Sequence, residues 1–99
     1  MKSELIGKYV IVRTYSAGVF AGILKARDGK EVILENSRRI WYWDGAASIS
    51  QLAVSGTSKP QSCKFPEAIP HHELTEAIEI IECTDAGKAS IEGVKVWRA

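Results

Sequence analysis

The chain has 99 residues, 13 of them basic and 12 acidic, which gives a formal net charge of +1 at neutral pH. This length predicts one domain spanning residues 1–99, and the near-neutral charge argues against long nucleic acid, which is bound mainly through excess positive charge. No apolar run has the length of a membrane span, and no hydrophobic signal core follows Met1 and Lys2. We therefore expect a cytoplasmic protein without a membrane partner.

Alternating apolar residues predict three strands in the first part of the chain: Lys8–Thr14, Val19–Arg27 and Glu31–Asn36. In the first strand, Tyr9 and Ile11 lie on one face and Val10 and Val12 on the other, so both faces are apolar. Such a strand is expected to lie between two layers. The dipeptide Asp28–Gly29 tolerates the positive φ angles of a two-residue hairpin turn, which predicts antiparallel pairing of the second and third strands.

The dipeptide Asn36–Ser37 is typical of another turn, after which the run Arg38–Trp43 predicts a fourth strand of the same meander. Its alternation places Arg39, Trp41 and Trp43 on one side. Guanidinium groups pair with phosphate, and aromatic faces stack on nucleobases, so this segment predicts a phosphorylated ligand with a base. The alternative is that the rings fill the core and the arginines are exposed charges at a strand end.

After this segment the apolar period changes to that of a helix, predicted over Ala46–Ser55. Asp44 or Gly45 is expected to cap its start, and Gly56 stands where a left-handed residue ends a helix. Thr57–Pro70 is rich in polar residues and holds three prolines, which predicts a long ordered loop.

A fifth strand is predicted over Leu74–Cys83 because of its β-branched residues, although the same apolar positions also fit a helix. Thr84 is a plausible N-cap for a second helix that runs to about Glu92 and ends at Gly93. The tail Val94–Trp97 alternates again, which is typical of an edge strand or of a segment that docks on a neighbouring subunit. The elements together predict an α+β fold with a small five-stranded antiparallel sheet and two short helices.

A second basic and aromatic group lies in the proline-rich loop, where Lys59, Lys64 and Phe65 are close in sequence. It is either a surface loop with one anchored ring or part of the same binding site as the tryptophan segment. Lys88 and Lys95 are further candidates for phosphate contacts near the end of the chain, although scattered surface cations are the default interpretation.

Residue types that carry catalysis are not arranged for it in the sequence. His71–His72 is interpreted as exposed loop rather than a metal site, because adjacent side chains on an extended segment point opposite ways. Cys63 and Cys83 lack metal-ligand or disulfide-framework spacing and are expected to be reduced thiols. There is no phosphate-binding loop, dinucleotide fingerprint or nucleophile elbow. We therefore expect a binding protein rather than an enzyme, without a cofactor or metal.

Several of these segments also resemble a known family. The similarity extends over Gly18–Gly22, Leu34–Ser48, Ser58–Pro60, Cys63–Phe65 and Ile78–Thr84. The chain is thereby similar to the first type of phage Thoeris anti-defence protein. The resemblance implies a phage-encoded sponge, acting in the infected bacterial cell, that binds cyclic ADP-ribose isomers made by TIR-domain enzymes. It holds them without cleavage, so the Thoeris effector is not activated.

The resemblance also implies an assembly and a set of contacts. Some members are hexamers that bind cyclic trinucleotides, so a homo-oligomer, dimer or hexamer, and a second ligand class are expected. The residues carried over by the resemblance are the arginine pair Arg38 and Arg39, the aromatic Phe65, the possible ribose partners Thr75 and Glu76, and the late basic residues Lys88 and Lys95. The last two are lysines where the resemblance implies arginines. The competing hypothesis is a small nucleic-acid-binding module that uses the same aromatic face.

Overall fold

A computed structural model describes residues 3–99. Met1 and Lys2, which begin the segment predicted to contain no signal peptide, lie outside the described residues. Five strands and two α-helices follow one another along the chain: β1 (Tyr9–Thr14), β2 (Val19–Asp28), β3 (Glu31–Arg39), α1 (Ile49–Ser55), β4 (Ile69–Leu74), β5 (Ala77–Glu82) and α2 (Asp85–Gly93). A short 3₁₀ helix, η1 (Pro60–Ser62), follows α1. The predicted α+β class, with a five-stranded antiparallel sheet and two helices, is confirmed.

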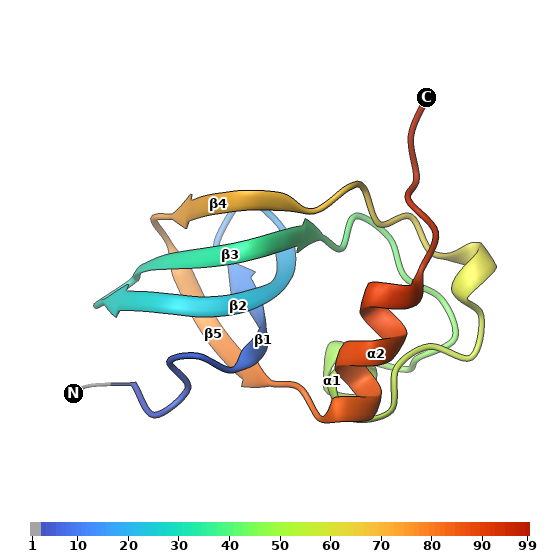
Figure 1. The fold of residues 1–99 in the computed structure, drawn as a ribbon, viewed down its shortest axis with the longest axis horizontal. Helices are drawn as coiled ribbons and strands as arrows, with labels where there is room; N and C mark the ends of the chain where they lie inside the picture. The colour runs from blue at the N-terminus through green and yellow to red at the C-terminus, as the bar shows by residue number, and fades with distance from the viewer. Residues whose placement is uncertain (1–2) are drawn as a thin grey trace.

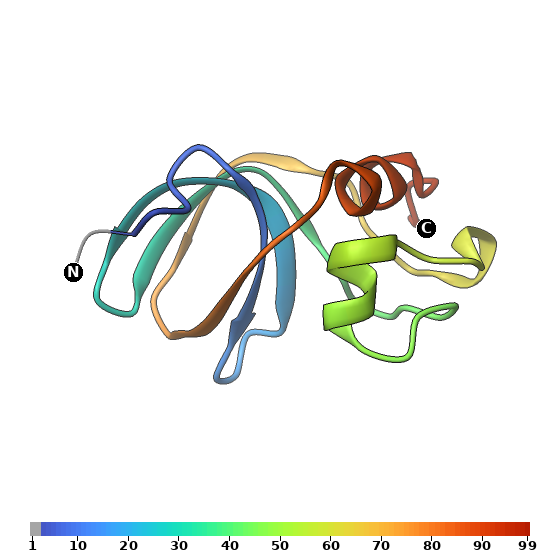
Figure 2. The ribbon, with the colours of Figure 1, turned by 90° about the horizontal axis from the view of Figure 1, so that it is seen from below.

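The sheet is rolled rather than flat. Its strand order is β4-β3-β2-β1-β5, with antiparallel pairing at every step. The two outer strands β4 and β5 are nevertheless consecutive in the chain and joined only by Thr75 and Glu76, so the sheet has to bend to bring its edges together. Figures 1 and 2 show this curvature, with both helices and the loop that follows β3 gathered at one end.

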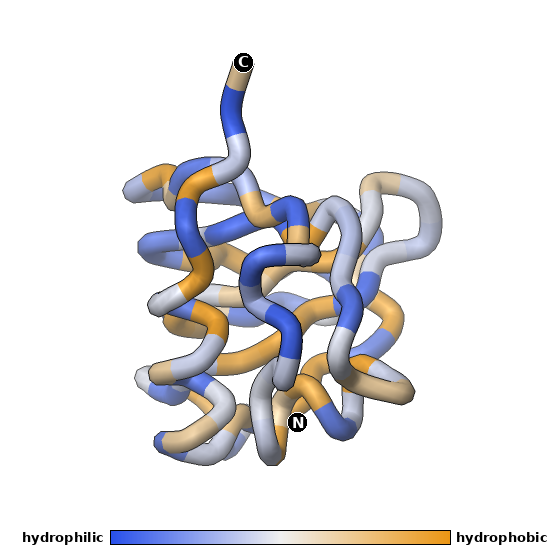
Figure 3. The backbone as a smooth tube through the Cα atoms, turned by 90° about the vertical axis from the view of Figure 1, so that its right-hand side faces the viewer, coloured by the Kyte–Doolittle hydropathy of each residue, from blue (hydrophilic) through white to orange (hydrophobic). Residues whose placement is uncertain are grey.

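Strand β1 is buried on both faces, as its sequence predicts. Tyr9 and Ile11 join a core cluster that also contains residues of both helices, whereas Val10 and Val12 join a second cluster with Phe20 and other strand residues. Figure 3 shows apolar (orange) stretches of backbone running through the interior of the molecule between more hydrophilic segments. One hydrophobic layer fills the rolled sheet and the other lies under the helices.

The predicted fourth strand at Arg38–Trp43 is wrong, because β3 continues to Arg39 and the chain then leaves the sheet. Asn36, taken as a turn residue, has a φ of 51° and lies at a register shift between β2 and β3. The extra residues of this bulge pass over Gly22, where an added Cβ would lie 2.9 Å from the Glu35 carbonyl oxygen. The turn predicted at Asn36–Ser37 is therefore wrong: the positive φ of Asn36 belongs to a bulge that bends β3 instead of ending it.

Several predicted boundaries also need correction. Helix α1 begins at Ile49 and is capped by Ser48, whose hydroxyl accepts from the Gln51 amide, rather than by Asp44 or Gly45. Asp44 instead accepts from its neighbour's amide and closes a local turn. The predicted C-cap is confirmed, since Gly56 has a φ of 76°.

The second half of the sheet comes from a region predicted as loop plus one strand. Strand β4 begins at Ile69, inside the expected loop, and continues beyond it to Leu74; it contains Pro70, which an edge strand tolerates. The expected strand Leu74–Cys83 is interrupted by the β4–β5 turn, so its first residue ends β4 and the rest supplies β5; extended rather than helical structure is confirmed for β5. Thr84 caps α2 as predicted, because its hydroxyl accepts from the Gly87 amide. The tail forms no strand, only a single parallel bridge between Val96 and Phe65.

His72 lies in β4, not in an exposed loop, and makes stability sensitive to pH. Its Nδ1 is 3.0 Å from the Ser37 hydroxyl, and its ring packs edge-on against Phe20 with centroids 4.8 Å apart. Burial, and then the charge of Arg39, lower the pKa of His72. The unfolded chain therefore takes up this proton at a higher pH than the folded protein does.

We expect the melting temperature to fall as the pH is lowered from about 6.5, the ordinary histidine value, through the lowered pKa of His72. Thermal unfolding measured between neutral and acidic pH tests this. The variant His72→Gln should flatten the dependence, whereas His71→Gln, at the exposed neighbouring position, should retain it. An identical pH dependence in both variants would show that His72 is not the responsible group.

Candidate ligand-binding surface

The tryptophan segment that follows β3 divides its rings between core and surface. Ile40 is buried, and Trp43 packs against the core cluster under the helices, with its Nε1–H donating to the Ala46 carbonyl at 3.2 Å. Trp41 and Tyr42 remain 58% and 47% exposed. The predicted side shared by Arg39, Trp41 and Trp43 is therefore not formed, since the segment is not a strand.

The C-terminal tail adds a third exposed ring to this region. The Trp97 ring, 43% exposed, stacks on Trp41 with centroids 5.1 Å apart and an interplanar angle of 24°. The tail is held in place because the Trp97 amide donates to the Phe65 carbonyl at 3.0 Å, next to the bridge at Val96. Two tryptophans 56 positions apart in the sequence thus share one surface.

An ammonium group lies over all three rings. Lys64 Nζ is 5.4 Å from the ring centroid of Trp41, and 5.7 Å from those of Tyr42 and Trp97. The backbone of Lys64 exchanges two hydrogen bonds with Tyr42, of 2.8 and 3.3 Å, which joins the loop to the tryptophan segment. We call Trp41, Tyr42, Lys64 and Trp97 the aromatic platform. Lys64 thus lies against the tryptophan segment, whereas Phe65 is buried, as the anchored-ring interpretation expects.

A groove of about 420 Å³ adjoins the aromatic platform. Its lining residues come from η1, the end of α2 and the tail: Pro60, Gln61, Cys63, Gly93, Lys95, Val96 and Trp97. Lys95 is exposed, and Trp97 belongs to both the groove and the platform. Flat aromatic faces beside an ammonium, with a second ammonium in the adjacent groove, can stack on a base and neutralise phosphate.

Arg38 and Phe65 are not available to a ligand in this structure. Phe65 has no exposed surface and is one of the largest side chains of the core. Arg38 is 5% exposed, and its guanidinium donates to the carbonyls of Pro66, Ile91 and Phe65 at 2.8, 2.7 and 3.0 Å. Their assignment as direct ligand contacts is corrected accordingly: both build the structure beneath the aromatic platform.

Arg39 lies at the surface, but it contacts the β1–β2 turn. Its Nη1 donates to the Ala17 carbonyl at 2.7 Å, and its guanidinium lies 4.5 Å from the Phe20 ring centroid. Arg39 is exposed and free to approach an anion with its remaining N–H groups. No contact joins it to the four platform residues.

The other predicted site residues are placed apart from the aromatic platform. Thr75 and Glu76 form the exposed β4–β5 turn, which lies at the opposite end of the molecule from the loop after β3 (Figure 1). Lys88 lies on α2 with its ammonium 5.7 Å from the Tyr9 ring centroid. Of the nine predicted residues, the structure brings together Trp41 on the platform and Lys95 in the groove beside it.

Two platform residues were assigned other roles from the sequence. In a strand, Tyr42 would alternate with the tryptophans and lie on the opposite face, and Trp97 belongs to the tail for which the sequence predicts an edge strand or a docking segment. The alternation of the tail did indicate extended structure. Its parallel bridge to Phe65, which seats Trp97 on Trp41, is a contact between distant segments and left no local signal.

The pKa values of Cys83 and Tyr9, both in the core, are raised, which disfavours the reactive ionised forms. Burial, followed by the charge of Glu82, raises the pKa of Cys83 to about 11, so its thiol stays protonated at neutral pH. Burial and then Glu92 raise the pKa of Tyr9 above its ordinary value. Both cysteines, expected from the sequence to be reduced thiols, are free, and both are buried. Among residues 3–99, no group of three or more His, Cys, Asp or Glu side chains is arranged to hold a metal ion.

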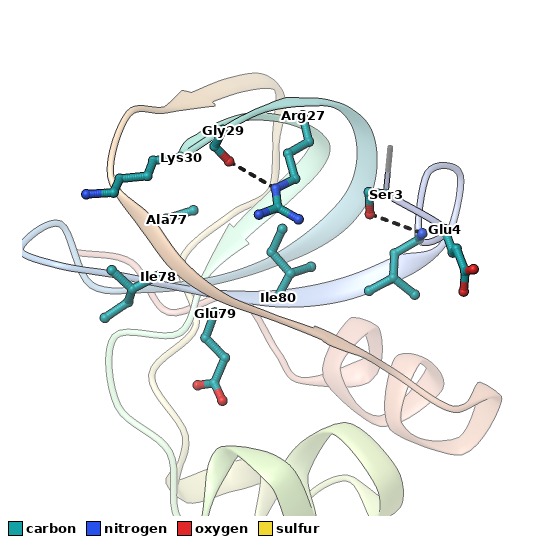
Figure 4. A pocket seen from close by; sticks show the side chains of 10 residues that line it. Ser3, Glu4, Arg27, Gly29, Lys30, Ala77, Ile78, Glu79 and Ile80 are labelled. Carbon is teal, nitrogen blue, oxygen red and sulfur yellow. Dashed lines mark hydrogen bonds between the residues drawn. The ribbon is translucent and has the colours of Figure 1, made fainter. Parts of the chain in front are cut away.

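A larger cavity, about 730 Å³, lies elsewhere, between the N-terminal segment, the β2–β3 turn and β5 (Figure 4). Arg27 enters it, but its Nε donates to the Gly29 carbonyl at 3.0 Å. The side chains of Lys30 and Glu79 point away from the Arg27 guanidinium, and Glu79 is paired with Arg13 at 2.9 Å. The polar groups that line this cavity do not converge on one point, so the aromatic platform is the stronger candidate binding site.

The fold and the surface define a small α+β protein, a rolled five-stranded sheet with two helices and a cluster of exposed rings around an ammonium. The chain belongs to a family described as a domain of unknown function, DUF6948, whose sequence pattern matches residues 7–91. No curated protein and no solved structure matches the chain. In the part of the chain that the structure describes, no helix is long and apolar enough to cross a membrane.

Proposed function

We propose that this protein is a phage anti-defence sponge that binds cyclic ADP-ribose isomers and withholds them, uncleaved, from Thoeris immunity. The observation that supports the proposal is the aromatic platform, in which three exposed rings and the Lys64 ammonium meet beside a groove containing Lys95. The likeness of the sequence to Thoeris anti-defence proteins supplies the ligand class.

The chemistry of the ligand matches these side chains. A cyclic ADP-ribose isomer has an adenine, whose face stacks on an exposed indole, and two phosphates, which require cations. Lys64 supplies an ammonium group 5.7 Å from the Trp97 ring centroid, and Lys95 lines the same groove as Trp97. The base is therefore assigned to the outer ring faces of the platform, and the phosphates to the two lysines.

Sequestration requires binding without turnover, so no catalytic group is assigned and the protein is proposed not to be an enzyme. Because Trp41 and Trp97 are about half exposed in the single chain, a second copy would be needed to enclose a ligand there. A homo-oligomer, dimer or hexamer, in the cytoplasm of the infected bacterium is part of the proposal. Cyclic trinucleotides are a second proposed ligand class.

A nucleic-acid-binding module is the second candidate, and the same platform supports it. Exposed rings beside lysines also bind single-stranded nucleic acid by stacking. The formal net charge of +1 disfavours this alternative, because such binding depends on neutralising many phosphates.

Native mass spectrometry after incubation with cyclic ADP-ribose isomers tests the proposal. We expect a ligand-bound oligomer that, after heat denaturation, releases the ligand with unchanged mass. Linear ADP-ribose, which has the same groups without the ring, is the control and should bind more weakly. Release of a hydrolysed product would make the protein an enzyme. Binding of a single-stranded oligonucleotide but of no cyclic isomer would favour the second candidate.

A further inference from the structure

Arg38 is a buried cation whose hydrogen-bond partners are backbone carbonyls, and its guanidinium also lies 5.5 Å from the Phe65 ring centroid. Its Nε, Nη1 and Nη2 each donate one hydrogen bond, to Pro66, Ile91 and Phe65 respectively. Arginine does not lose its charge in proteins, so burial at this position is tolerated only because these oxygens replace water. The planar fork of the guanidinium therefore joins the end of β3 to the loop and to the last turn of α2.

The carbonyls that Arg38 holds also hold the tail. The Phe65 oxygen accepts from Arg38 Nη2 and from the Trp97 amide, both at 3.0 Å. The Ile91 oxygen accepts from Arg38 Nη1 and from the Val94 amide, where the tail leaves α2. Both ends of the segment between Val94 and Trp97 are thus anchored on carbonyls whose positions the same guanidinium determines.

We propose that Arg38 is the positioning residue of the aromatic platform. It acts through the Phe65 and Ile91 carbonyls, which set where the tail lies and hence whether Trp97 stacks on Trp41. The inference about affinity rests on the proposed function, whereas the inference about the stack does not. Lysine cannot replace Arg38, because an ammonium on a flexible stem does not reproduce a rigid fork that reaches three oxygens.

The variant Arg38→Lys tests this by circular dichroism. Two stacked indoles couple their electronic transitions, so the wild-type protein should show a paired band in the tryptophan absorption region. We expect Arg38→Lys to lose this band and to bind the cyclic ADP-ribose isomer at least about tenfold more weakly. Val12→Ala, in the core cluster inside the rolled sheet, is the control: it should lower the melting temperature but retain both the band and the affinity.

Loss of the paired band in Val12→Ala as well, or its retention in Arg38→Lys, would overturn the proposal. If wild-type protein binds no cyclic isomer, the proposed function fails, while the band still decides the role of Arg38. Hydrogen exchange of wild-type protein covers the case in which Arg38→Lys does not fold. The Arg38 Nε–H and the Trp97 amide should exchange with the same opening equilibrium. Rapid exchange of the Trp97 amide beside a protected Arg38 would disprove the coupling.

Discussion

Replacing Gly87 with alanine is expected to destabilise the protein by about 3 kcal/mol or more, beyond the usual range for overpacked sites. Gly87 lies in the first turns of α2, where the helix crosses the end of α1. An added Cβ would overlap the Ala53 carbonyl oxygen and lie 2.7 Å from its carbon. Backbone atoms cannot rotate away as a side chain can, so the two helices have to separate.

Thermal unfolding measures this effect, and we expect the melting temperature to fall by at least about 10 °C. Gly93→Ala is the matched control, since it lies on the same helix and nothing is within 4 Å of its added Cβ. Alanine is the better helix former, so this control should be neutral or slightly stabilising. Equal melting temperatures for the two variants would show that the contact between α1 and α2 is not close-packed in solution.

Features that depend on a few neighbouring residues could be predicted from the sequence. The apolar alternation of β1 predicted two buried faces, Thr84 predicted a helix start, and Gly56 predicted a helix end. Each of these depends on residues within one turn or strand. The hairpin between β2 and β3 was placed one residue too early, because Asp28 pairs with Glu31 and the turn residues are 29 and 30.

Features that depend on distant segments could not be predicted. The bulge at Asn36 fits only because a glycine lies beneath it on β2, so a residue that normally signals a turn instead extends β3 to Arg39. With β3 extended, the tryptophan segment becomes a loop, and the missing strand is supplied by β4. The count of five strands was therefore right, although one of the five predicted segments was not a strand.

In the candidate site, too, features set by residue type could be predicted and features set by contacts between distant segments could not. Residue type identified Trp41 and the arginine pair as unusual, but type alone could not separate an exposed ring from a buried one, or a free guanidinium from a bonded one. Phe65 and Arg38 became structural because the loop and α2 close over them. Trp97 became a surface ring because its amide reaches the Phe65 carbonyl. These outcomes depend on tertiary contacts that no local pattern encodes.

Replacing Trp97 with alanine is expected to weaken binding of a cyclic ADP-ribose isomer by about tenfold to a hundredfold. Stacking of one base on one aromatic side chain contributes about 1–3 kcal/mol, and the substitution also removes the partner that orients Trp41. Isothermal titration calorimetry measures the change. Because the Trp97 ring is 43% exposed and its backbone hydrogen bond remains, the melting temperature should change little.

Tyr15→Ala is the matched control for this experiment. Tyr15 is an exposed aromatic on the β1–β2 turn and is not part of the aromatic platform, so its removal should leave affinity unchanged. Equal weakening by both substitutions would indicate non-specific loss of aromatic surface, and full affinity in Trp97→Ala would place the ligand elsewhere.

A selective effect of Trp97→Ala would instead assign the base to a ring that stays in place only because the tail is hydrogen-bonded to Phe65. In that case ligand affinity depends on the contacts that hold residues 94–97 in place, and mutations that release this segment should reduce binding while the rolled sheet remains folded.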